Sequence, residues 1–180
     1  MPVSRLIFFP EDTHQITDYK KLVTTLVNSG LIQSQAHSEN HYLPGDNFLS
    51  LLTFLGCSPN INITPSDNED HCFISLIPVS EKAKCLGFTR TAKPKCPSCT
   101  RRIANWETEH WQQHNQTCLC DKCQTKTLYA DLNWKQECGF GQCGFEIAHI
   151  YPHEAVPGEQ LLNALEQYSG FKWQYCYANN

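Results

Sequence analysis

Residues 96–123 read CPSCTRRIANWETEHWQQHNQTCLCDKC, and this stretch decides how the chain is organised. It contains two Cys-x2-Cys pairs separated by 20 residues. Two residues between cysteines make a tight turn that points both sulfur atoms at one ion, and two such turns supply the tetrahedral four-sulfur shell that zinc prefers. A separation of about 15–20 residues is the length of a hairpin that brings the turns together. The spacing therefore predicts one structural Zn2+ bound by Cys96, Cys99, Cys120 and Cys123.

Other ligand sets compete with this assignment. Cys118 lies two residues before Cys120 and is an alternative ligand, although its use breaks the paired spacing. His110 and His114 give the pattern Cys-x2-Cys-x10-His-x3-His with the first cysteine pair, where the middle gap is shorter than the usual value of about twelve. A second metal site further along the chain is also possible. The competing interpretation is that its two cysteines are buried free thiols. Its candidate ligands are Cys138, Cys143, His149 and His153.

Over about residues 96–123 the chain resembles a zinc ribbon. The resemblance implies a zinc-stapled hairpin with the four cysteines of the two pairs as ligands. Thr100 and Gln124 follow the pairs at positions where ribbons often have Gly. Residues 43–59 and 151–157 resemble segments of uncharacterised bacterial zinc-ribbon proteins, which implies a shared architecture and no known activity.

The composition is that of a folded protein with reduced cysteines. Of 180 residues, 41% are hydrophobic and 18% are charged, which fits one compact domain with a small inserted module. There is no run of about 18 apolar residues, and residues 1–10 lack the apolar core and cleavage site of a signal peptide. Eleven cysteines without a secretion signal indicate metal ligands and core thiols rather than a disulfide framework. We therefore expect a cytoplasmic protein without membrane contact.

The net charge of −4 conceals a basic segment at residues 82–102. This segment has seven basic residues and no acidic one, whereas both flanking parts of the chain are acidic. Such a block is typical of an anion-binding patch or of a solvated linker. Cations beside the cysteines also serve to balance the negative charge of four thiolates around one metal ion. The candidate contacts for an anion or a nucleic acid are Lys93, Lys95, Arg101 and Arg102.

The N-terminal part combines strands and helices. An apolar run predicts a buried strand over 6–9, and apolar residues at helical spacing predict a helix from Thr17 or Asp18 to Asn28, ended by Gly30. A second, short helix is expected from Asp46 or Asn47 to Leu55. Turn-forming residues predict a loop over 59–70. A strand over 72–79 is expected to pair with residues 85–89.

The C-terminal part repeats this arrangement. We expect a half-buried strand over 128–134, a bend at 139–141, a strand over 145–151, a helix over 157–168 and a last strand over 171–177. Two strand–helix–strand units then flank the cysteine module and share one sheet. The predicted fold is α+β, a small mixed sheet with two or three helices and an inserted zinc ribbon. Its parts are residues 1–90, the insertion 91–127, and residues 128–180, which complete the first domain.

No catalytic motif is present. A four-cysteine zinc site is closed to substrate, and the chain lacks both a phosphate-binding Gly-rich loop and a nucleophile elbow. Cys57 follows a predicted helix C-terminus, where the dipole disfavours a thiolate. The aromatic residues that alternate over 171–177 form either a base-stacking surface or a sheet face packed under a helix, and the preceding leucine-rich helix favours the second.

These observations favour a non-enzymatic, cytoplasmic zinc-binding adaptor or interaction protein. Its partner is a protein or a nucleic acid. A nucleic-acid-binding protein that uses the basic segment 82–102 is the first alternative. A hydrolase or transferase of unknown substrate is the second, with His149, His153 and Glu154 as its candidate polar groups.

Overall fold

The structure, a computed structural model, describes residues 3–56, 61–65 and 71–179. Within these residues it has three α-helices, one six-stranded sheet and three two-stranded sheets, so the predicted α+β class is confirmed. Cys57 and most of the predicted loop 59–70 lie outside the described residues. In the described part, no helix has the length and apolar character needed to cross a membrane.

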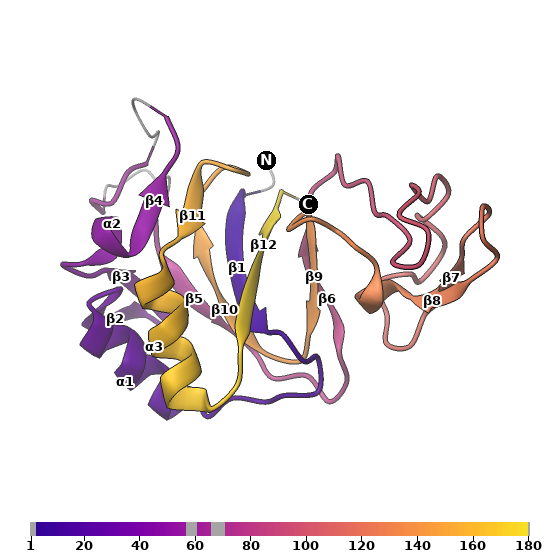
Figure 1. The fold of residues 1–180 in the computed structure, drawn as a ribbon. Coiled ribbons are helices and arrows are strands. Elements are labelled where there is room, and N and C mark those ends of the chain that lie inside the picture. The colour runs from indigo at the N-terminus through magenta and orange to yellow at the C-terminus, as the bar shows by residue number, and fades with distance from the viewer. Residues whose placement is uncertain (1–2, 57–60, 66–70, 180) are drawn as a thin grey trace.

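The six-stranded sheet is the centre of the fold (Figure 1). All of its neighbouring strands run antiparallel, so the expected mixture of strand directions is absent from the pairs described. The two strand–helix–strand units do share this sheet. The strand order is β12 (Trp173–Ala178), β1 (Arg5–Pro10), β10 (Gly144–Ala148), β5 (Ile74–Ile77), β3 (His41–Pro44) and β2 (Ile32–Ser38).

Strand β1 is buried on both faces. Leu6 and Phe8 pack in the main core under the helices, whereas Ile7 and Phe9 pack on the opposite face with Cys176. A strand covered on both sides needs apolar residues at successive positions, because alternate side chains point to opposite faces. This explains why an uninterrupted apolar run predicted the strand correctly.

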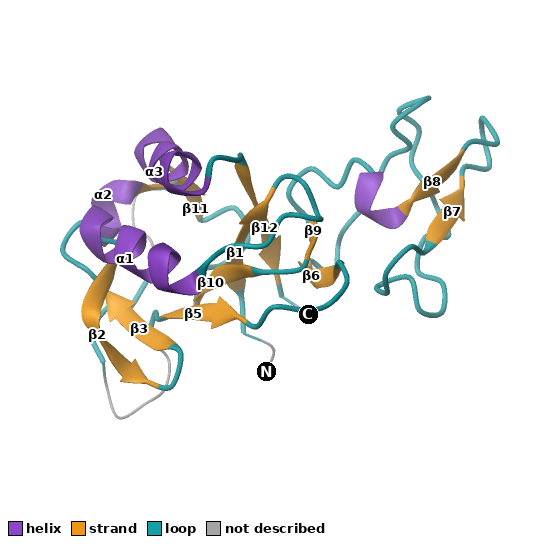
Figure 2. Ribbon diagram, turned by 90° about the horizontal axis from the view of Figure 1, so that it is seen from below, coloured by secondary structure: helices purple, strands orange, loops and turns teal. Residues whose placement is uncertain are grey.

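The three helices cover one face of the sheet (Figure 2). Helix α1 (Tyr19–Ser29) begins at Asp18, whose carboxylate accepts hydrogen bonds from the N–H groups of Lys20 and Lys21, and it ends at Gly30 with a φ of 78°. Helix α3 (Glu159–Ser169) ends in the same way at Gly170, with a φ of 77°. Both ends follow the local rules for N-caps and glycine C-caps, so both predicted helices are confirmed.

The second predicted helix is wrong in its second half. Helix α2 (Phe48–Leu51) stops after one turn, and β4 (Leu52–Phe54) follows directly. Strand β4 pairs with β11 (Ala155–Pro157), a partner about a hundred residues further along the chain. The gain from this long-range pairing overrides the local helical pattern.

Three predictions around the cysteine module are also wrong. Residues 85–89 do form a strand, β6 (Lys84–Phe88), but it pairs with β9 (Cys138–Gly141) and not with the strand over 72–79. The predicted bend at 139–141 is therefore part of a strand. In place of a strand over 128–134, β8 ends at Leu128 and a 3-10 turn, Tyr129–Asp131, follows. The indole N–H of Trp134 donates to the Tyr129 carbonyl and closes this turn.

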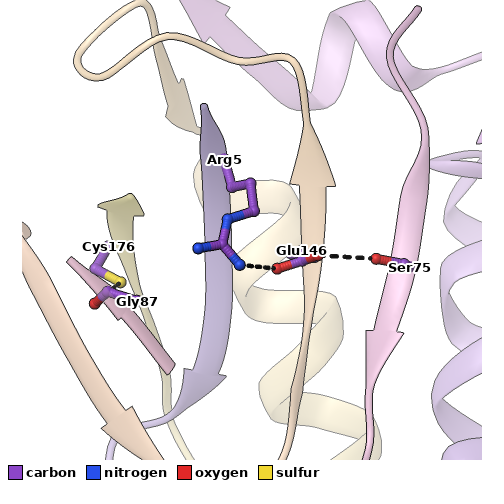
Figure 3. Close-up of polar contacts among 5 residues, drawn as sticks. All are labelled: Arg5, Ser75, Gly87, Glu146 and Cys176. Atoms are coloured by element: carbon purple, nitrogen blue, oxygen red, sulfur yellow. Dashed lines mark hydrogen bonds and ion pairs between the residues drawn. The ribbon is translucent and has the colours of Figure 1, made fainter. Parts of the chain in front are cut away.

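A polar triad crosses the face of the sheet opposite the helices (Figure 3). The Arg5 Nη1 atom lies 3.1 Å from Glu146 Oε2, and the Ser75 hydroxyl donates to Glu146 Oε1 at 3.1 Å. These residues come from β1, β10 and β5, three neighbouring strands of the sheet. Beside β1, the thiol of Cys176 donates to the carbonyl of Gly87 at 3.9 Å, which joins β12 to β6.

The cysteine module has a hydrophobic core of its own. It lies beyond the β6–β9 pair, at the end of the molecule away from the helices, and finishes in the hairpin of β7 (Thr117–Leu119) and β8 (Lys126–Leu128) (Figure 1). Three of the four tryptophans of the chain pack together there with Tyr129. They are Trp106, Trp111 and Trp134, with ring centroids 4.8 to 5.7 Å apart.

Candidate metal centre

The structure brings the two cysteine pairs together. Cys96 Sγ lies 3.6 Å from Cys123 Sγ, and Cys99 Sγ lies 3.7 Å from Cys120 Sγ. All four sulfur atoms lie within 4.8 Å of one another. In a tetrahedral zinc site with Zn–S bonds of about 2.3 Å, the sulfur atoms are about 3.8 Å apart. The four cysteines are therefore close enough to hold one metal ion.

The first pair sits on a turn between two antiparallel residues, Lys95 and Arg102. The N–H of Cys96 donates to the carbonyl of Arg101 at 2.9 Å, and the N–H of Thr100 donates back to the carbonyl of Cys96 at 2.9 Å. These bonds fold the chain back on itself within six residues. As a result, both sulfur atoms of the pair project to the same side.

The second pair sits on a turn of the same design, at the tip of the β7–β8 hairpin. The N–H of Cys120 donates to the carbonyl of Thr125 at 3.0 Å, and the N–H of Gln124 donates to the carbonyl of Cys120 at 2.9 Å. Leu119 and Lys126 pair across this turn as Lys95 and Arg102 pair across the first. Two equivalent turns thus face each other across the four sulfur atoms.

The residue after each pair explains an unusual feature of the sequence. Thr100 and Gln124 both have a φ of 60°, the left-handed conformation that Gly adopts without strain. The turns therefore demand this conformation although neither position has Gly. Both turns form with residues other than Gly at these positions.

The four thiols differ in burial and in acidity. Cys96 and Cys120 are buried, Cys99 is half-buried and Cys123 is exposed. The hydroxyl and the N–H of Thr125 lower the pKa of Cys123 to about 6. The N–H of Arg101 favours the Cys99 thiolate, but desolvation and the neighbouring thiols outweigh it and raise the pKa of Cys99 to about 11. A bound cation stabilises all four thiolates, so metal binding releases protons.

The competing ligands lie elsewhere. Cys118 is buried in the aromatic core of the module, and burial raises its pKa. The ring of His110 pairs with Glu109 at 3.2 Å and contacts Gln113, and His114 lines a cleft. Among the described residues, the only group of three or more side chains able to share an ion is the four-cysteine group.

The residues proposed for a second metal site are dispersed. Cys138 Sγ lies 3.7 Å from Cys85 Sγ, and the thiol of Cys143 donates to the carbonyl of Gln15 at 3.5 Å. The ring of His153 packs against Tyr177 with centroids 4.6 Å apart, whereas His149 lies beside Phe73. The alternative interpretation, buried free thiols, fits Cys138 and Cys143, and the ten described cysteines form no disulfides.

Two cavities adjoin the module. The larger cavity, about 600 Å3, is lined by residues at and after the end of β1 and by residues of the module. Its charged lining residues include Glu11, Asp12 and Asp131. None of the three residues named for a hydrolase or transferase lines it. Glu154 instead accepts a hydrogen bond from the N–H of Tyr151 at 3.2 Å.

The smaller cavity has a volume of about 410 Å3. It is lined by three of the four predicted anion contacts, Lys93, Lys95 and Arg102. Arg101 is exposed and does not line it. The remaining lining residues are Lys135, Gln136, Glu137 and His153. Lys135 and Gln136 escaped prediction because neither belongs to a charge run, and only the fold brings them to the basic segment.

The aromatic residues of the last strand are part of the core. Trp173 and Tyr177 are buried beneath α3, and Tyr175 and Phe171 pack against the same cluster. This confirms the expectation that the alternating aromatics form a covered sheet face and not a base-stacking surface.

Fold and site together define an α+β protein with a four-cysteine candidate metal centre on a projecting hairpin module. Comparison with known proteins adds no relative: no family model, no curated protein and no solved structure matches the chain.

Proposed function

We propose that this chain is a non-enzymatic, cytoplasmic zinc-binding interaction protein, in which a zinc ribbon over residues 96–123 presents a surface to a macromolecule. The observation that carries the proposal is the convergence of four sulfur atoms within 4.8 Å on two equivalent turns. Four cysteine ligands complete the tetrahedral shell of zinc and leave no position for a substrate. Reduced thiols at all ten described cysteines support a reducing compartment.

The outer face of the hairpin supports an interaction role. Leu119 is 57% exposed and Leu128 is 36% exposed. The strand register places these two side chains on one face, with Cys118 on the other. Two large apolar side chains exposed on so short a hairpin are the kind of feature that a protein partner covers.

Metal analysis of untagged protein tests the zinc assignment. We expect one zinc per chain in the wild type and none in the Cys120→Ser/Cys123→Ser variant, whose tryptophan fluorescence shifts as the module unfolds. Cys118→Ser is the matched control, since it removes a neighbouring thiol outside the four-sulfur group and keeps the metal. Zinc retained by the double variant contradicts the proposal.

Partner capture tests the interaction role. We expect a protein partner to copurify with the wild type at both low and high salt, and to be lost with Leu119→Ser/Leu128→Ser while zinc content stays at one. The control is Leu49→Ser/Leu55→Ser, which removes two exposed leucines far from the module. Turnover of a substrate by zinc-loaded protein, without any partner, would favour the enzyme alternative.

A further inference from the structure

The smaller cavity beside the metal module concentrates positive charge in an acidic protein. Four cations line it, and they come from two separate segments of the chain. In the part of the chain that the structure describes, none of the four forms an ion pair with a carboxylate. Glu137, the single carboxylate in the lining, accepts the backbone N–H of Lys93 at 3.2 Å. The four cations are Lys93, Lys95, Arg102 and Lys135.

The backbone holds two of these cations opposite each other. Lys95 and Arg102 form an antiparallel bridge, so their side chains leave the same face of the turn. Lys95 is also fixed from its other side, because its N–H and carbonyl both bond to Asn133 at 3.0 Å. Like charges directly opposite each other destabilise a strand pair. A bound anion converts this repulsion into two attractions.

Three residues that line the cavity have an uncommon backbone conformation. Lys135, Gln136 and His153 have φ values of 51°, 63° and 65°, the left-handed region that residues other than Gly rarely occupy. Gln136 is held there by the N–H of Tyr177, which donates to its carbonyl at 2.8 Å. Such conformations cost free energy and concentrate at binding sites. All three residues line this cavity, and Lys135 and Gln136 lie at its border with the larger cavity, which they also line.

The size and charge of the cavity indicate its ligand. A volume of about 410 Å3 suits a small molecule. Cations and amide donors without carboxylate partners match the oxygens of phosphate groups. The basic residues Lys82, Lys84 and Arg90 do not line the cavity, and the rest of the chain is acidic, which favours a compact ligand over a long strand. A compact ligand with two or three phosphates fits best.

We propose that this cavity binds a di- or triphosphate group, either as free pyrophosphate or as part of a larger molecule such as a nucleotide, through Lys93, Lys95, Arg102, Lys135 and His153. The inference rests on the proposed function in one respect: the metal-bound turn at Cys96 fixes the Lys95–Arg102 bridge. The ligand would then occupy a position between the module and the sheet. It adds a small-molecule site to a protein whose zinc centre is closed.

Calorimetric titration of zinc-loaded protein with pyrophosphate tests this site. We expect binding to the wild type and at least about tenfold weaker binding to Lys95→Gln/Arg102→Gln, which loses two charge-assisted contacts. Lys82→Gln/Lys84→Gln is the matched control, because it removes the same charge from the same basic segment outside the cavity and keeps wild-type affinity. ADP is expected to bind and adenosine is not. Zinc content and melting temperature, measured on every sample, show that each variant is folded.

Each alternative result has a definite meaning. If neither pyrophosphate nor ADP binds the zinc-loaded wild type, the phosphate site is refuted and the zinc proposal stands. If the purified protein contains no zinc, the zinc proposal is refuted. If pyrophosphate affinity falls equally in both double variants, the total positive charge of residues 82–102 causes binding, and the cavity is refuted as the binding site. Binding of a twelve-nucleotide single strand that pyrophosphate does not compete away also rejects it, in favour of a strand-binding surface.

Discussion

The Sγ atom of Cys96 lies 3.6 Å from that of Cys123, although 27 positions separate the two residues in the chain. This pair, like Cys99 and Cys120 at 3.7 Å, thus joins two different turns. A metal ion at their centre ties the two turns together, whereas in its absence each cross-turn pair is a short movement from a disulfide bond of about 2.05 Å.

Removal of the metal is therefore expected to make these thiols sensitive to oxidation. Mild diamide treatment of chelated protein should produce Cys96–Cys123 and Cys99–Cys120 disulfides, and zinc should suppress both because bound thiolates do not exchange freely. Peptide mapping under non-reducing conditions measures the yield. Cys85 and Cys138, with sulfur atoms 3.7 Å apart outside the metal group, are the internal control. Cross-turn disulfides that form equally fast with zinc present would contradict the assignment.

Glycine at the two left-handed positions is expected to stabilise the module. Thr100→Gly and Gln124→Gly each relieve a backbone conformation that costs other residues about 1–2 kcal/mol, offset in part by the greater freedom of Gly in the unfolded chain. We expect a net gain of about 0.5–1 kcal/mol per site, larger for the β-branched Thr100. Urea unfolding of zinc-loaded protein measures it. Ser98→Gly, in the same turn but without positive φ, should be neutral or destabilising.

Gly144 has a steric role in the sheet. A Cβ atom there would lie 2.1 Å from the carbonyl oxygen of Phe8, a backbone atom in the neighbouring strand β1. Gly144→Ala must push β10 away from β1 and should cost about 3 kcal/mol or more. Gly141→Ala is the control: its nearest new contact, 3.2 Å, is the flexible end of Leu86, so a cost below about 1 kcal/mol is expected. Similar melting temperatures for the two variants would refute this account.

Stability should fall as pH rises above about 9. Burial raises the pKa of Cys72 from 9.0 to about 12, and burial likewise raises the pKa of Tyr177 from 10.0 to about 12. Between these values the folded protein keeps protons that the unfolded chain has released. The folded state therefore loses stability as pH increases, and the contribution of these groups is complete only below pH 9. For Cys72 alone the loss at pH 10.5 is about 2 kcal/mol.

Urea unfolding at pH 8.0, 9.5 and 10.5 checks this dependence. Cys72→Ala lowers stability at every pH because it leaves a small cavity, but its curve should be less steep than that of the wild type. Parallel curves for the two proteins would show that Cys72 does not titrate as described. Absorbance of tyrosinate, followed in the wild type and in Tyr177→Phe, separates the contribution of Tyr177 from those of Tyr19 and Tyr168, for which burial also raises the pKa to about 12.

Features that depend on residues close together in the sequence were predicted correctly, whereas features that depend on distant residues were not. The N-cap at Asp18, the glycine ends of α1 and α3, and the two cysteine turns depend on residues within a few positions of one another, and local patterns predicted them. The spacing of the cysteines predicted which four sulfur atoms meet, because a short turn leaves few alternatives.

Long-range pairing was beyond such patterns. Nothing near Cys85 indicates that β6 pairs with residues 138–141, and nothing near Leu52 indicates that the chain leaves its helix to pair with Ala155–Pro157. The basic cavity shows the same limit. Its charge run was visible in the sequence, but Lys135 and His153, which lie before β9 and before β11, join it only through the fold.

The position of β1 has a consequence for biosynthesis. Arg5 meets Glu146, which is 141 residues later in the chain, and β12 is later still. At 5–20 residues per second, a ribosome needs roughly ten to thirty seconds to add that length. Throughout this time the apolar strand β1, whose two faces are both covered in the folded protein, lacks its partner strands. The cysteine module cannot protect it, because Cys120 and Cys123 are themselves added only shortly before Glu146. The newly made chain thus carries an unprotected apolar segment for almost the whole of its synthesis, the state in which a holdase chaperone is most useful.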